Sequence, residues 1–263
     1  MGYRLAAAPL LPLLHVQGRR LNRVLPRLPE PPGARVGGPS GETAGADIAG
    51  ASTAGSAAAP PPEPLRLLVL GDSAAAGVGA TSQDAALLGQ LVAALAPASP
   101  VAWRLVARTG ATAAGTRRHL AARPPEPCDV AVVVLGLNDL VVGRGTAAVL
   151  ADLEAIVDTL QRGWGARHVV LSGMPPVGRF PALPQPLRWY LGRRARALDA
   201  ALGAWVAGRP GCEVLPLDLA FDVAEMAADG FHPGPALYAA WGRAVAARVR
   251  AWQGSGQGQH PGP

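Results

Sequence analysis

The 263-residue chain contains no lysine, only two cysteines and few aromatic residues. Without lysine there can be no Gly-Lys-Ser/Thr phosphate-binding motif, and the net charge of +6 comes from arginine. Cys128 and Cys212 form neither a CxxC pair nor a cluster with histidine, which excludes a cysteine zinc site and a disulfide framework. We expect two free thiols in a reducing compartment. Because no His, Cys and carboxylate cluster has ligand spacing, we expect no metal and no cofactor.

Long hydrophobic runs are also missing, although 49% of the residues are apolar. No run is long enough to span a bilayer. Residues 5–16 are apolar and follow Arg4, as in a signal peptide, but they include two prolines and lead into Gly18-Arg19-Arg20 instead of a cleavage site. We therefore expect a cytoplasmic protein rather than a secreted one. The segment could be a disordered arm, a packed segment or an anchor that associates weakly with a membrane surface.

The arginines are scattered over the whole length instead of clustering among aromatic residues. This distribution is typical of an arginine-rich composition and predicts no specific nucleic-acid partner. A weak attraction to anionic lipid or nucleic acid remains compatible with the net charge.

Composition divides the chain into three regions. Residues 1–63 are an apolar-basic segment followed by a Pro/Gly/Ala-rich linker, since the stretch from Pro29 to Pro64 has almost no large apolar residue after Val36. Residues 64–253 carry all the periodic segments, and residues 254–263 read as a flexible tail. The sequence therefore predicts one folded domain, over residues 64–253.

Short apolar runs alternate with helical patterns in this domain, which predicts an α/β fold with a parallel sheet covered by helices on both faces. The expected strands are Leu65 to Leu70, Val101 to Ala107, Val130 to Leu135, His168 to Leu171 and Cys212 to Pro216. The expected helices are one capped by Ser82, one from about Thr146, one over Leu187 to Val206 and one over Ala236 to Trp252. Ligands of such sheets bind beyond the carboxyl ends of the strands.

Chemistry-bearing residues follow the predicted strands at that edge. Ser73 ends Gly71-Asp72-Ser73 after the first strand, Gly110 follows the second, and Asn138 lies in Gly136-Leu137-Asn138-Asp139 after the third. After the fifth comes Asp229-Gly230-Phe231-His232, whose acid and imidazole can hydrogen-bond. Each signal alone also fits an ordinary turn or helix cap. Together they supply a nucleophile, a base, an acid that orients the base, and oxyanion donors.

This ordered set resembles the SGNH/GDSL-like serine hydrolase superfamily over about residues 65–252. The resemblance implies a flavodoxin-like three-layer fold with a five-stranded parallel sheet, and hydrolysis of a small-molecule ester without a metal. It implies Ser73 as nucleophile, His232 as base and Asp229 as its partner, with Ser73, Gly110 and Asn138 forming the oxyanion hole. One departure is Ala74, where the family name has leucine.

Several alternatives stay open on the sequence. Within the family, the enzyme could be an esterase for short acyl or acetyl groups, an O-deacetylase, a thioesterase or a lysophospholipase. A non-catalytic binding module with the same fold is a further reading. A Rossmann-like nucleotide site at Gly77-Val78-Gly79 has the wrong glycine spacing and leaves the Asp229/His232 loop unexplained. The Pro-rich segment Met174 to Pro186, with Phe180 and Leu183, is expected to line an acyl site or to form a lid.

Overall fold

A six-stranded sheet organises the computed structural model, which describes residues 8–38, 63–217 and 221–256. The strands lie in the order β1-β3-β2-β4-β5-β6. Their bounds are Val36–Gly37 (β1), Leu65–Gly71 (β2), Val101–Ala107 (β3), Val130–Val134 (β4), His168–Ser172 (β5) and Cys212–Leu215 (β6). Strands β2 to β6 are parallel, as predicted, and each begins at the predicted residue. Their order, β3-β2-β4-β5-β6, is that of flavodoxin-like folds, in which successive strands are added first on one side of β2 and then, from β4 on, on the other.

Strand β1 is an addition to the five-stranded sheet that the sequence predicts. It pairs antiparallel with β3, with Val36 opposite Arg104. Two residues are too few to show a periodic pattern, so only the tertiary structure reveals the strand.

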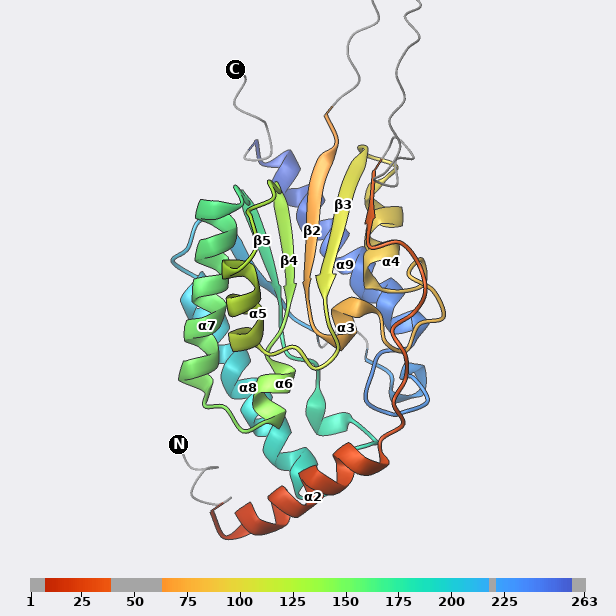
Figure 1. The fold of residues 1–263 in the computed structure, drawn as a ribbon, viewed down its shortest axis with the longest axis vertical. Helices are drawn as coiled ribbons and strands as arrows, with labels where there is room; N and C mark the ends of the chain where they lie inside the picture. The colour runs from red at the N-terminus through yellow and green to blue at the C-terminus, as the bar shows by residue number, and fades with distance from the viewer. Residues whose placement is uncertain (1–7, 39–62, 218–220, 257–263) are drawn as a thin grey trace, which may run out of the picture.

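Helices cover both faces of the sheet, so β2 is buried on both sides. Leu68 and Leu70 face a core built with α5, α7 and α8, whereas Leu67 and Val69 face a core built with α4 and α9. Figure 1 shows α9 behind the strands and α5 in front of them. The helices are α4 (Leu87–Leu95), α5 (Ala113–Ala121), α7 (Thr146–Asp158), α8 (Leu187–Val206) and α9 (Pro235–Gly254). Burial on both faces explains why the strands read as continuous apolar runs.

Two short helices follow strand ends and were not predicted separately: α3 (Ser73–Ala76) after β2 and α6 (Leu137–Val141) after β4. The prediction that Ser82 caps the next helix is wrong. Helix α4 begins later, with Ala86 at its N-cap, and the Ser82 hydroxyl accepts a hydrogen bond from Ala85 N–H within a preceding turn. Serine favours turns and caps for the same local reason, so its position alone could not separate the two.

The N-terminal segment packs on the domain through helix α2 (Leu11–Val24), whose Leu14 and Leu21 are buried in the main core. The expected linker begins later than Pro29, because residues 29–37 lie against the sheet: Gln83 N–H donates to Pro32 O, and Leu105 N–H donates to Arg35 O. The remainder of that linker, residues 39–62, and the tail beyond residue 256 lie outside the described residues. In the part of the chain that is described, no helix is long and apolar enough to cross a membrane.

Candidate active site

Ser73 lies where β2 gives way to α3, at the carboxyl edge of the sheet. The preceding Gly71 permits this turn, because a Cβ there would lie 2.4 Å from Val134 O and 2.6 Å from the Cβ of Ala75. Asp72 caps α3 by accepting a hydrogen bond from Ala74 N–H. Ser73 is 8% exposed, so its hydroxyl is held in a largely enclosed environment.

His232 reaches Ser73 from a loop 159 residues further along the chain. Its Nε2 lies 2.9 Å from Ser73 Oγ, and its Nδ1 lies 2.5 Å from Asp229 Oδ2. The other Asp229 oxygen accepts hydrogen bonds from Phe231 N–H and His232 N–H. The loop that precedes α9 thus fixes the carboxylate, and the carboxylate fixes the imidazole.

The electrostatics of this trio follow from these contacts. Burial alone would raise the pKa of Asp229, but the hydrogen bonds from the His232 ring and from the two backbone N–H groups together hold its pKa below the ordinary value. An ionised Asp229 favours the imidazole tautomer with the proton on Nδ1. Nε2 is then free to accept the proton of the Ser73 hydroxyl.

Asp72 and Asn138 meet beside Ser73. Asn138 Nδ2 donates to Ala111 O at 3.0 Å and lies 3.4 Å from Asp72 Oδ2. Burial raises the pKa of Asp72 to about 6, against the opposing effects of the Ala74 hydrogen bond and of His232. Asn138 is not the cap of α6, whose N-cap is Gly136, so its side chain faces the site instead.

Gly110 lies on the loop between β3 and α5 with φ +78°, a left-handed conformation that favours glycine. Within the described ranges, neither Gly110 N–H nor Ser73 N–H donates to a backbone carbonyl. Ala111 is the residue after Gly110, and its carbonyl accepts a hydrogen bond from Asn138 Nδ2. The structure therefore brings the three predicted oxyanion donors to one edge of the sheet.

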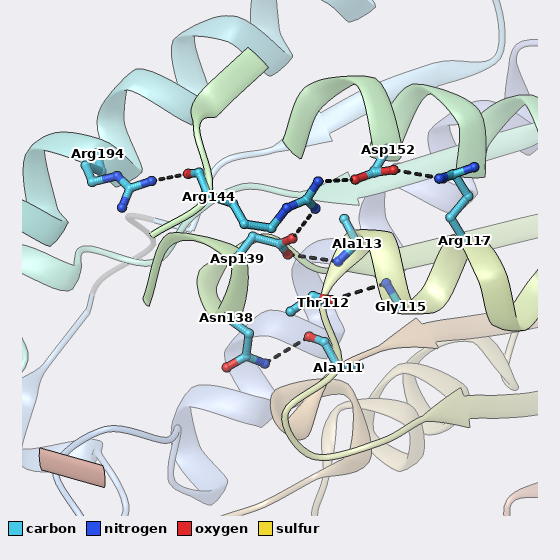
Figure 2. Close-up of polar contacts among 10 residues, drawn as sticks. All are labelled: Ala111, Thr112, Ala113, Gly115, Arg117, Asn138, Asp139, Arg144, Asp152 and Arg194. Carbon is cyan, nitrogen blue, oxygen red and sulfur yellow. Dashed lines mark hydrogen bonds and ion pairs between the residues drawn. The ribbon is translucent and has the colours of Figure 1, made fainter. Parts of the chain in front are cut away.

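An ionic network that begins at a buried carboxylate lies behind these donors, as Figure 2 shows. Asp139 is fully buried and accepts from Ala113 N–H and from Arg144, both at 2.8 Å. Arg144 also pairs with Asp152 at 2.7 Å, and Asp152 pairs with Arg117. Asp139 ends the Gly136-Leu137-Asn138-Asp139 motif, which taken alone also fits a helix cap. Its carboxylate holds the first residue of α5, which follows the loop that carries Gly110.

The same loop is held from the N-terminal side by Glu30. Its Oε1 accepts hydrogen bonds from Thr109 N–H at 2.9 Å and from the Thr109 hydroxyl at 2.7 Å, while Oε2 pairs with Arg35. Burial would raise the pKa of Glu30, but these contacts together hold it below the ordinary value. No sequence signal marked Glu30, because it lies in a stretch read as linker.

A pocket of about 90 Å³ opens beside Ser73, Asn138 and His232. Its wall is largely apolar and includes Met174, Phe180, Phe221, Met226, Phe231 and Trp241. The Pro-rich segment after β5 contributes Met174 and Phe180 to this wall, whereas Leu183 is buried in the core. Among the described residues, no group of three or more His, Cys, Asp and Glu side chains could hold a metal ion. Cys128 and Cys212 are free.

Several solved structures share this fold. The chain is 19% identical to a carbohydrate acetylesterase family member from Sinorhizobium meliloti (TM-score 0.55, covering 72% of this chain and 99% of that one). It is 20% identical to the psychrotrophic esterase EstA from Pseudoalteromonas sp. (TM-score 0.54, 72% and 98%). It is 25% identical to TesA (TM-score 0.56, 71% and 98%). No curated protein matches the sequence.

The model of the GDSL-like lipase/acylhydrolase family matches residues 69–240, which include all five positions discussed above as nucleophile, base, acid and oxyanion donors. This match spans more than half of the chain and nearly the whole sheet. The chain therefore belongs to the GDSL-like lipase/acylhydrolase family and is an enzyme that hydrolyses ester bonds.

Proposed function

We propose that the enzyme cleaves carboxylic esters through an acyl-enzyme on Ser73, with His232 as general base and Asp229 as the acid that orients it. The continuous chain of hydrogen bonds from Asp229 through His232 to Ser73 is the observation that carries this proposal. It has the geometry that a serine nucleophile requires: a base within hydrogen-bond reach, itself oriented by a third group.

The proposed first half-reaction forms the acyl-enzyme. Ser73 Oγ attacks the carbonyl carbon while His232 Nε2 accepts the hydroxyl proton. The negative oxygen that develops is bound by Ser73 N–H, Gly110 N–H and Asn138 Nδ2. Asn138 can exchange its long 3.4 Å contact with Asp72 for this oxygen while it keeps its bond to Ala111. As the tetrahedral intermediate collapses, His232 gives its proton to the departing alcohol.

The second half-reaction regenerates the enzyme. Water attacks the acyl carbonyl and loses a proton to His232, and the same donors bind the oxyanion. When the bond to Ser73 breaks, His232 returns the proton to Ser73 Oγ, and the carboxylic acid leaves. Each cycle consumes one ester and one water and releases one alcohol and one acid.

We propose short acyl or acetyl esters as substrates, with the acyl group in the apolar pocket. The pocket supports this orientation, because its wall beyond the polar edge offers Phe180, Phe231 and Trp241 rather than hydrogen-bonding groups. Two of the structural neighbours are described as a carbohydrate acetylesterase and an esterase. O-deacetylation, thioester hydrolysis and lysophospholipid hydrolysis use the same site, and substrate chemistry distinguishes them.

The test combines a substrate series with a label for the nucleophile. Rates on p-nitrophenyl esters from acetate to dodecanoate should be highest for the short chains, and a fluorophosphonate should modify Ser73. Ser73→Ala should lose both the label and turnover, with a residual rate of about a thousandfold over water from binding and the oxyanion hole. Near wild-type turnover in Ser73→Ala would remove Ser73 from the mechanism. Absence of turnover on every ester and thioester, with no label, would favour a binding module.

A further inference from the structure

Helix α2 has an outward face that the domain does not cover. Leu14 and Leu21 fix the helix to the core from one side. On the rest of its circumference four aliphatic side chains are exposed: Leu11 (53%), Leu13 (45%), Val16 (60%) and Val24 (64%). They make up four of the six large hydrophobic side chains that are exposed in the described part of the molecule. Exposed apolar residues therefore concentrate on this one helix.

The charge of the same segment has one sign. The first acidic residue of the chain is Glu30, and five arginines precede it. Of these, Arg19, Arg20, Arg23 and Arg27 are exposed, and none forms an ion pair with an acid within the described residues. Elsewhere the arginines Arg66, Arg117 and Arg144 are paired with aspartates. Across the described ranges, no acidic side chain neutralises the cations of the α2 face.

The placement of α2 connects this face to the active site. Figure 1 shows α2 lying across the end of the molecule to which the strands point. The helix is fastened there by Gln17, whose side chain bonds Gln185 O and Leu187 N–H. Its Leu14 and Leu21 belong to the same core as Phe180, which lines the pocket beside Ser73. A surface bound by α2 would therefore lie at the pocket's end of the molecule.

We propose that α2 docks the enzyme on an anionic lipid surface. Exposed arginines are attracted to the negative headgroups, and the aliphatic side chains between them bury in the headgroup–acyl boundary, as in interfacial amphipathic helices. Around the exposed face of α2, arginine side chains alternate with aliphatic side chains, so the helix has no separate polar and apolar sides there. The helix therefore adsorbs shallowly, and its binding depends strongly on lipid charge and on salt. This inference does not depend on the proposed catalytic mechanism.

The experiment measures binding of the full chain to vesicles by sedimentation. Vesicles of phosphatidylcholine alone are compared with vesicles that also contain phosphatidylglycerol, at low and high salt. We expect binding only to the anionic vesicles and a marked loss at high salt. The variant R19Q/R20Q/R23Q should bind at least about tenfold more weakly. V16S should weaken binding without changing its dependence on lipid charge.

A matched control separates this surface from net charge. R118Q/R162Q/R243Q removes the same three charges from exposed sites on α5, on the segment Thr159–Gly163 and on α9, and it should bind like the wild type. Melting curves by circular dichroism verify that each variant is folded. Equal weakening in both triple variants would overturn the proposal in favour of net charge alone. Binding to uncharged vesicles would also overturn the proposal. So would a failure to bind any vesicles, combined with self-association of the protein that R19Q/R20Q/R23Q abolishes.

Discussion

The carboxylate of Asp139 accepts a hydrogen bond from the backbone N–H of Ala113 at 2.8 Å, and this contact joins helix α6, which carries Asn138, to the start of α5, which follows the loop that carries Gly110. Asp139 is fully buried, and Arg144 pairs with it at 2.8 Å. The relative position of two proposed oxyanion donors therefore depends on a residue that does not face the substrate.

Asp139→Asn should lower kcat more than it raises KM, because it loosens the link between helix α6 and the Gly110 loop without changing the pocket wall. The substitution should also lower stability, because Asp139 is fully buried and its charge is paired with Arg144. Asp129→Asn is the matched control, because Asp129 pairs with Arg66 at the opposite end of β4. This variant should lose stability but retain kcat. An unchanged kcat in folded Asp139→Asn would show that the contact serves stability alone. Steady-state kinetics and thermal melts measure both quantities.

Asn138→Ala should reduce kcat about a hundred- to thousandfold, or about 2.7–4 kcal/mol, with a smaller effect on KM. The lost donor acts on charge that develops only in the transition state. The two backbone donors remain, so some activity survives. Asn138→Asp should be at least as damaging, because it places a negative charge beside the forming anion. A variant that loses melting temperature but keeps kcat would contradict the oxyanion role.

Asp229→Asn should lower kcat by about three to four orders of magnitude while it retains the fold. Asparagine can still accept from Phe231 N–H and His232 N–H, but it no longer stabilises the imidazolium and can impose the wrong tautomer. Turnover on the preferred p-nitrophenyl ester and labelling of Ser73 by a fluorophosphonate measure the effect. A loss below tenfold would show that His232 needs no ionised partner.

Asp72 should make stability fall between about pH 4 and pH 7. Burial raises its pKa to about 6, so the folded chain binds this proton more tightly than the unfolded chain. Its contribution is complete below the unfolded pKa and is lost as pH rises through 6, by at most about 3 kcal/mol. Asp72→Asn should remove this dependence. Melting temperatures of the two proteins at pH 5 and pH 8 test it: a difference that does not change with pH would refute the expectation.

Glu30→Ala should lower kcat several-fold, because it frees the Thr109 backbone that leads into Gly110. The lost hydrogen bonds are partly exposed and should cost about 1 kcal/mol of stability. Glu30→Gln keeps an acceptor for Thr109 and should restore most of the activity.

A chain that lacks residues 1–38 loses both Glu30 and β1, so it should be less stable and less active than the full chain. Full activity in that truncated chain would exclude a role of the segment in the site.

The local sequence was sufficient to predict the five parallel strands of the sheet, because each is a contiguous, mostly apolar run that can be recognised without knowing its partners. Val130 to Val134 is an unbroken apolar run that only a strand buried on both faces accommodates well. Strand β1 and the start of helix α4 could not be predicted in this way. The two residues of β1 carry no period, and the start of α4 at Leu87 depends on how residues 77–86 turn beneath Pro31 and Pro32.

The candidate site divides in the same way. Ser73, Gly110, Asn138, Asp229 and His232 each stand in a short motif after a predicted strand, so residue type and strand order alone nominated them. The sequence by itself thus determined the α/β class and the edge of the sheet to which the candidate residues belong, and it nominated the residues that we propose to react. Only the tertiary structure decided which side chains hold that edge in place, Asp139 and Glu30 among them, and which face of α2 stays open. These depend on contacts between segments 26 to 170 residues apart, whose partners no local pattern encodes.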